Sequence, residues 1–169
     1  MSVVVAEEGN KRVGDMTAAE VEQCIFDIKS WFGRKVGEAI EGASQADIQR
    51  LEKTLDFSIP REIKAFLREV NGVIYFMDKK ALTTNEIADV AADVDSNSQW
   101  KAGYFPLCGD SSSMLIVDTM HGDAVFEWDS DDGKGDEVGA SFSAYLEQYR
   151  NTLLGGHCDF IRDIGVIES

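Results

Sequence analysis

The stretch of sequence that decides the fold reads Ile59-Pro60-Arg61-Glu62-Ile63-Lys64-Ala65-Phe66-Leu67-Arg68-Glu69-Val70-Asn71-Gly72. Proline in the first turn of a helix loses no hydrogen bond, and its ring fixes φ at a helical value. Gly72 is suited to the left-handed conformation that ends many helices. Between these signals, four apolar residues recur at i, i+3, i+4 and i+7: Ile63, Phe66, Leu67 and Val70. The stretch predicts a helix that begins at Pro60, is ended by Gly72 and packs one apolar face on a core.

A second helix is predicted directly before this one. Ser44 stands three residues before Asp47, which is the spacing of a helix N-cap, and Ile48, Leu51 and Leu55 then recur on one face. Only the short segment 56–58 separates the two helices.

This order of elements resembles the SUKH superfamily: a helix, a short linker, Ile-Pro, a helix ending in Asn-Gly and an apolar strand. Later segments fit the same pattern in order: Phe105-Pro106-Leu107, Met114-Leu115-Ile116-Val117-Asp118, Val125-Phe126-Glu127-Trp128 and Ser141-Phe142-Ser143-Ala144-Tyr145-Leu146. The resemblance covers roughly residues 44 to 154. It departs from the superfamily at Val73, where a second glycine is common, and in the helix before Ser44. SUKH proteins include fungal cell-wall assembly regulators, bacterial toxin-immunity proteins and a subunit of the tubulin polyglutamylation complex.

The remaining segments complete an α+β pattern. Capping boxes predict helices from about 18 to 32 and after Thr83, and Ser141 precedes a third amphipathic segment that Gly155 ends. Apolar runs predict strands at 73–77, 104–108, 114–118 and 124–128, followed by an acidic loop over 129–139. These elements predict a small antiparallel or mixed sheet with helices packed mainly on one side, which is also the architecture that the SUKH resemblance implies.

Length and composition indicate one domain. A chain of 169 residues, 44% of them hydrophobic, buries about 70% of its unfolded surface. We expect a flexible lead over residues 1–14 and a single SUKH-like domain over 15–169, with an added N-terminal helix and a C-terminal tail. Cys24, Cys108 and Cys158 are an odd number without metal-ligand spacing, so they predict buried, reduced thiols in a cytoplasmic protein.

The charge of the chain limits its partners. Thirty-one acidic residues against 16 basic ones give a formal charge of −15, which disfavours nucleic acids and anionic membrane surfaces. No run approaches the roughly 20 apolar residues of a membrane helix, so we expect no membrane insertion. Eight of the acids lie between Asp118 and Glu137, where Lys134 is the only base. This asymmetry favours either a basic protein partner or a role in solubility alone.

Catalytic patterns are missing from the sequence. His121 lies in a hairpin connection and His157 follows two glycines, and both are expected to be plain surface residues. The small-residue segment 109–113 could hold a serine nucleophile, but no histidine base is placed beside it, so a turn is the better interpretation. The sequence predicts a protein that is not an enzyme and needs no cofactor.

The acidic loop raises the question of calcium, because hard cations prefer clustered carboxylates. With Asp129 as position 1 of an EF-hand loop, glycine falls at position 5 instead of 6, and position 12 is not glutamate. We therefore predict no metal site, and consider a solvated loop or a contact with a basic protein instead.

Two tryptophans flanked by charged residues complete the candidate partner surface, because tryptophan is a common interface anchor. Either one could also cap the core from a strand end. The candidate partner-binding residues are Trp100, Trp128, Asp129, Asp131, Asp132, Asp136 and Glu137.

The sequence thus predicts a non-catalytic protein-binding module or a subunit of a larger assembly, in the cytoplasm and in a cytoskeletal or ciliary setting. The resemblance leaves open a bacterial immunity protein that masks a basic toxin. The residues also leave open a calcium-responsive sensor or an enzyme whose catalytic residues converge from distant parts of the chain.

Overall fold

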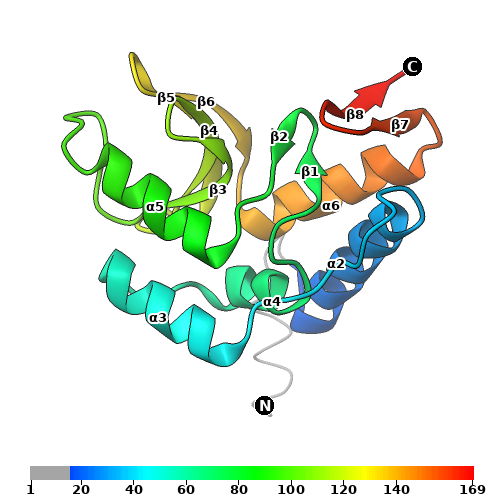
Figure 1. The fold of residues 1–169 in the computed structure, drawn as a ribbon, viewed down its shortest axis with the longest axis horizontal. Coiled ribbons are helices and arrows are strands. Elements are labelled where there is room, and N and C mark those ends of the chain that lie inside the picture. The colour runs from blue at the N-terminus through cyan, green and yellow to red at the C-terminus, as the bar shows by residue number, and fades with distance from the viewer. Residues whose placement is uncertain (1–15) are drawn as a thin grey trace, which may run out of the picture.

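A computed structural model describes residues 16–169 (Figure 1). The expected flexible lead over residues 1–14 lies outside the described residues. The elements are, in chain order, α2 (Ala18–Gly33), α3 (Gln45–Leu55), α4 (Arg61–Glu69), β1 (Tyr75–Phe76), β2 (Lys79–Lys80), α5 (Thr84–Val94), β3 (Tyr104–Asp110), β4 (Ser113–Asp118), β5 (Ala124–Asp129), β6 (Gly133–Gly139), α6 (Phe142–Leu154), β7 (Cys158–Ile161) and β8 (Gly165–Glu168).

The largest sheet has four antiparallel strands in the order β3-β4-β5-β6, and β1-β2 and β7-β8 form two hairpins. Helix α6 packs against β5 and β6 and also against α2, while α5 packs against β3 and α3. In Figure 1, α3 and α4 lie below the sheet, α5 lies at its left side, and α6 and α2 lie to its right. The α+β class and the SUKH-like arrangement are confirmed.

Three helices begin after the predicted cap residues, and all three caps are capping boxes, including the one at Ser44 that the sequence predicted only as an N-cap. The hydroxyls of Thr17, Ser44 and Thr83 each accept a hydrogen bond from the backbone N–H three residues later, at 3.2, 3.1 and 3.1 Å. In all three, the acidic side chain at that third position accepts a hydrogen bond from the cap N–H in return. Each box therefore satisfies two backbone donors that the first turn of a helix leaves free.

The end of α4 differs from the prediction. The helix stops at Glu69, and Val70 is extended (φ −137°), so Gly72 (φ +86°) belongs to the turn that follows. Asn71 explains this early stop. Its backbone N–H donates to Glu41 O at 2.8 Å, and its side-chain oxygen accepts from the N–H of Thr84 at 2.9 Å. Tertiary hydrogen bonds therefore replace the last helical turn.

The apolar face of α4 lies in the core, as predicted. Ile63, Phe66 and Leu67 are all buried. The ring of Phe66 lies 5.7 Å from that of Phe76 in β1 and 5.9 Å from that of Phe142 in α6, measured between centroids. One side chain of α4 thus connects three parts of the fold.

The strand predicted at 73–77 is shorter than expected. It forms only the two-residue β1, which pairs with β2 in a hairpin that the sequence did not reveal. The reason is the backbone, because Val73 (φ +71°) and Met77 (φ +55°) both take left-handed conformations that interrupt a strand.

Tyr149 of α6 holds this hairpin in place. Its hydroxyl donates to Tyr75 O at 2.7 Å and accepts from the N–H of Met77 at 3.1 Å. The side chain is buried, so the two hydrogen bonds are shielded from water.

We expect Tyr149→Phe to lower the free energy of unfolding by about 1 to 2 kcal/mol, because the substitution leaves a half-buried carbonyl and N–H without their partner. Urea denaturation measures this loss. Tyr145→Phe is the matched control, since Tyr145 stacks on Tyr149 with centroids 6.2 Å apart but takes no part in this pair of hydrogen bonds. Equal losses in the two variants would contradict the role given to the hydroxyl.

The acidic segment 129–139 is not a loop, and this prediction was wrong. It contains β6, which pairs with β5 through registers such as Trp128↔Lys134. Most of the charged residues of β6 are exposed because β6 is an edge strand. An edge strand need not alternate apolar and polar residues, so its sequence carries no strand signal.

The C-terminal tail is also ordered into a hairpin, β7-β8, and the N–H of Val166 donates to Met77 O at 2.9 Å. Cys24, Cys108 and Cys158 are buried and free, as expected. Burial raises the pKa of all three thiols.

Candidate functional site

Two of the predicted segments meet at one end of the sheet. The amide nitrogen of Asn97 donates to Ser130 O at 3.0 Å. The ring of Trp100 lies 5.3 Å from that of Trp128, at an angle of 87°. These contacts join the loop after α5 to the β5–β6 hairpin. We call residues 95–100 and 129–132 together the acidic end.

The turn between β5 and β6 is held by one carboxylate. Asp129 Oδ1 accepts the backbone N–H groups of Asp131 at 2.9 Å and Asp132 at 2.7 Å. This is the local turn chemistry that favours aspartate. Because Asp129 is occupied within the turn, Asp131 and Asp132 are the residues whose exposed carboxylates face solvent. Asp136 and Glu137 are exposed on β6.

The two candidate tryptophans have different places. Trp128 is only 2% exposed, so it belongs to the core and offers no surface to a partner, contrary to its place among the candidates. Its indole Nε1 is buried without a hydrogen-bond partner within residues 16–169. Trp100 is half-buried and also contacts Tyr104, with centroids 5.3 Å apart. The prediction for Trp128 was based on its charged neighbours. Adjacent residues of a strand point to opposite faces of the sheet, so exposed neighbours do not indicate that Trp128 is exposed.

Asp118 is a buried carboxylate that the sequence interpretation missed. It is 1% exposed. Its Oδ2 lies 3.0 Å from Lys134 Nζ and 3.0 Å from His121 Nδ1. Burial by itself raises the pKa of Asp118, but the hydrogen bonds from Lys134 and His121 outweigh it, and the pKa lies below its ordinary value. His121 is exposed, as expected, but it also pairs with the Asp118 carboxylate. The two residues are three positions apart, and this spacing could have indicated the contact.

The eight acids from 118 to 137 therefore do not form one surface. Asp118 and Asp123 lie at the opposite end of β5 from the acidic end. Burial raises the pKa of the Asp123 carboxyl, and the nearby carboxylates of Glu62 and Asp118 raise it further. Lys134, the only base of this segment, is bound to Asp118.

The described residues contain no evident metal centre. Within residues 16–169, no group of three or more histidine, cysteine, aspartate or glutamate side chains is arranged to hold a metal ion.

The hollows on the surface of the described residues include two that lie between helices. The first, of about 590 Å³, lies between the end of α3, α5 and segment 100–104, and we call it the Trp100 groove. It is lined by Thr54, Leu55, Phe57, Ala88, Ala91, Ala92, Asp95, Trp100, Lys101, Ala102, Gly103 and Tyr104.

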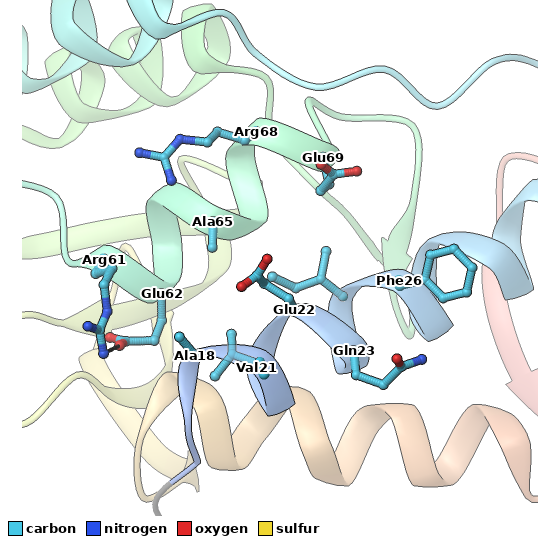
Figure 2. Close-up of a pocket in the computed structure, with 12 residues that line it drawn as sticks. Ala18, Val21, Glu22, Gln23, Phe26, Arg61, Glu62, Ala65, Arg68 and Glu69 are labelled. Atoms are coloured by element: carbon cyan, nitrogen blue, oxygen red, sulfur yellow. Dashed lines mark hydrogen bonds and ion pairs between the residues drawn. The ribbon is translucent and has the colours of Figure 1, made fainter. Parts of the chain in front are cut away.

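The second hollow, of about 650 Å³, lies between α2 and α4. In Figure 2, Glu22 on α2 points toward α4, whereas Phe26 on α2 and Arg68 on α4 point away from each other. Phe26 is 62% exposed beside it. Because acids and bases alternate around this hollow, its charge favours no class of partner.

None of the helices in the described part of the chain is long and apolar enough to cross a membrane. A search of curated proteins finds no match to the chain. The model of the SMI1 / KNR4 family (SUKH-1) matches residues 42–148, which span α3 to the middle of α6 and leave α2 and the β7-β8 hairpin outside. The matched region is close to the range over which the resemblance was expected, and the chain belongs to the SMI1 / KNR4 family (SUKH-1).

Proposed function

We propose that this protein is a non-catalytic protein-binding module that holds a basic partner protein on its acidic end. One observation carries the proposal. The Trp100 loop and the β5–β6 turn, about 30 residues apart in sequence, are joined by the Asn97–Ser130 hydrogen bond and the Trp100–Trp128 ring contact. This places a half-buried aromatic residue next to exposed carboxylates, a combination typical of interface anchors and their charged rim.

The charge distribution supports the same proposal. Lys134 reaches away from the acidic end to Asp118 and passes over the ring of Phe126, 3.8 Å from its centroid. In the part of the chain that the structure describes, the ion pairs do not involve Asp131, Asp132, Asp136 or Glu137. Like charges left together in this way repel, and a basic partner would relieve that repulsion.

The cellular setting of this binding has two candidates. SUKH domains occur in toxin-immunity proteins and in cell-wall-related proteins. An acidic surface suits the masking of a basic toxin. The ordered α2 and β7-β8 elements, which lie outside the family match, support the other candidate, a subunit of a larger cytoplasmic or cytoskeletal assembly. The three buried thiols are compatible with a reducing cytoplasm.

Affinity capture from the native host, followed by mass spectrometry, tests which setting applies. An immunity protein returns one basic toxin, whereas an assembly subunit returns several proteins in fixed proportion. Recovery of neither kind of prey at the salt concentration of the cell would count against a protein-binding role.

We expect the double variant Asp131→Asn/Asp132→Asn to bind the captured partner with an association rate roughly tenfold lower at low salt, and with a flatter salt dependence. Asparagine keeps the size of the side chain, and Asp129 is left unchanged because it holds the turn. Surface-plasmon kinetics at two salt concentrations measure both effects.

The matched control is Glu38→Gln/Glu41→Gln. It removes the same two charges from exposed positions between α2 and α3. If both double variants slow association equally, only the net charge of the protein matters, and the acidic end is not the binding surface.

A further inference from the structure

The Trp100 groove has apolar walls from two directions. On α5, Ala88, Ala91 and Ala92 form a low wall at i, i+3 and i+4. Opposite them, Leu55 and Phe57 come from the end of α3, where Asp56 takes a left-handed conformation (φ +61°) and reverses the chain. Both side chains pack on the core with one side and are half-buried. The small alanines leave room that larger side chains would fill.

Trp100 closes the groove where it meets the acidic end. Its ring is fixed by two perpendicular ring contacts, with Tyr104 and Trp128. A tryptophan held from two sides loses little further conformational entropy when a partner packs on it. The hollow of about 590 Å³ lies within the range of roughly 300 to 1,000 Å³ that is common for binding pockets.

The rim of the groove is acidic. Asp95 lines it, and Glu86, Asp89 and Asp93 are exposed on the solvent side of α5, which carries no lysine or arginine. Lys101 is the only basic residue among those that line the groove. The β5–β6 turn continues this charge, because Asn97 binds Ser130 next to Asp131 and Asp132.

We propose that the Trp100 groove receives a large apolar side chain from a basic segment of the partner protein. The inference rests on the proposed function and gives it a site and a partner chemistry. The alanine wall, Phe57 and Trp100 would bury the apolar side chain, and the carboxylates of α5 and the β5–β6 turn would face the flanking lysines or arginines. The apolar contact sets the lifetime of the complex, and the acidic rim sets its rate of formation.

Three synthetic peptides of twelve residues test the site on the full chain by calorimetric titration. The first has eight lysines around a central Leu-Phe-Phe-Leu, the second has Ser-Ser-Ser-Ser in the centre, and the third has glutamates in place of the lysines. We expect the first peptide to bind at least tenfold more tightly than the second, and the third not to bind.

Protein variants locate the binding. Ala92→Trp fills the groove from an exposed position. In this variant we expect the first peptide to bind only as tightly as the second peptide does. Ala46→Trp, at an exposed position of α3 outside the groove, should leave both affinities unchanged. Trp100→Ala is a second variant, which should raise the dissociation constant of the first peptide about tenfold. Circular dichroism confirms that each variant is folded.

The outcomes separate the two proposals. Equal binding of the first and second peptides, or an unchanged affinity in Ala92→Trp, would overturn the groove as the apolar site while leaving the acidic end as a basic-protein surface. Failure of both lysine peptides to bind would overturn the groove and count against the acidic end as well.

Discussion

Replacement of Phe66 by alanine is expected to lower the free energy of unfolding by about 3 to 5 kcal/mol, the usual cost of removing a buried phenylalanine. Phe66 is 2% exposed. Its ring contacts Phe76 from the β1-β2 hairpin and Phe142 from α6, so no single element can move to close the cavity. Because a domain of this size is stable by about 5 to 15 kcal/mol, the loss removes a large part of the total stability and lowers the melting temperature markedly.

Urea denaturation and the melting temperature measure this effect. The control is Phe26→Ala, because Phe26 is the same residue type on a neighbouring helix but is 62% exposed. We expect that variant to stay within about 0.5 kcal/mol of the parent protein. An unchanged melting temperature in Phe66→Ala would mean that the apolar face of α4 does not support the core.

The helices could be predicted because their signals are local. Each capping box joins residues three apart, as in Thr17–Glu20 and Thr83–Glu86. The apolar faces repeat within a few turns. The helix end at Glu69 could not be predicted, since it depends on the hydrogen bond that the Asn71 N–H donates to Glu41 O and the one that the Asn71 side chain accepts from the Thr84 N–H. Tertiary contacts of this kind leave no pattern in the sequence.

The strands show the same limit. β3, β4 and β5 are apolar and were predicted, whereas β6 is an exposed, charged edge strand and was taken for a loop. Pairing with β5 makes it a strand, and its own residues do not indicate one. The burial of Trp128 follows from the same sheet, because its side chain points to the packed face while its neighbour Glu127 is exposed.

The sequence predicted the individual residues of the candidate site but not which of them lie close together. Trp100 and the β5–β6 aspartates were identified from composition, but the hydrogen bond that joins their loops spans 33 positions in the sequence. The Trp100 groove was not predicted, since its walls come from α3, α5 and the following loop. Alanines at helical spacing resemble an ordinary helix surface until a neighbouring element forms the opposite wall.

Asp118 offers the second large effect, because it is a buried charge with few partners. At 1% exposure it depends on Lys134 and His121, whose nitrogens each lie 3.0 Å from Oδ2, and on the N–H of Met120 at 3.2 Å from Oδ1. A buried carboxylate that loses its cation keeps the cost of dehydration without the compensating attraction.

Lys134→Met is therefore expected to lower the free energy of unfolding by about 2 to 3 kcal/mol at pH 7, less than for a fully buried pair because the lysine side chain is 32% exposed. Methionine keeps the apolar packing over Phe126. Lys101→Met is the control, because it removes one exposed lysine whose ammonium donates to the backbone oxygen of Ser98, at 3.3 Å, and forms no ion pair within residues 16–169. We expect that change to stay within about 0.5 kcal/mol.

The pH dependence of this loss identifies its cause. The pKa of Asp118 is lower in the folded protein than its ordinary value of 3.8. A depressed carboxyl pKa stabilises the fold above the unfolded pKa, and the stabilisation disappears as the pH falls through the folded pKa. The difference between the parent protein and Lys134→Met should therefore be largest above about pH 5, and should shrink as the pH falls below about 4, where Asp118 of the unfolded chain begins to take up a proton.

A double-mutant cycle isolates the interaction between the two charges. In Asp118→Asn/Lys134→Met neither charge remains, so the double variant should be more stable than Lys134→Met alone at pH 7. Position 118 should then contribute no pH dependence to its free energy of unfolding between pH 3 and 5. Urea denaturation at pH 3, 5 and 7 measures all four proteins. The loss of stability in Lys134→Met could be the same at pH 3 and pH 7, or it could remain when Asp118 is replaced by asparagine. Either result would show that Lys134 stabilises the sheet by its packing over Phe126 and Tyr104. In that case the Asp118 carboxylate would be compensated by His121 and the backbone alone.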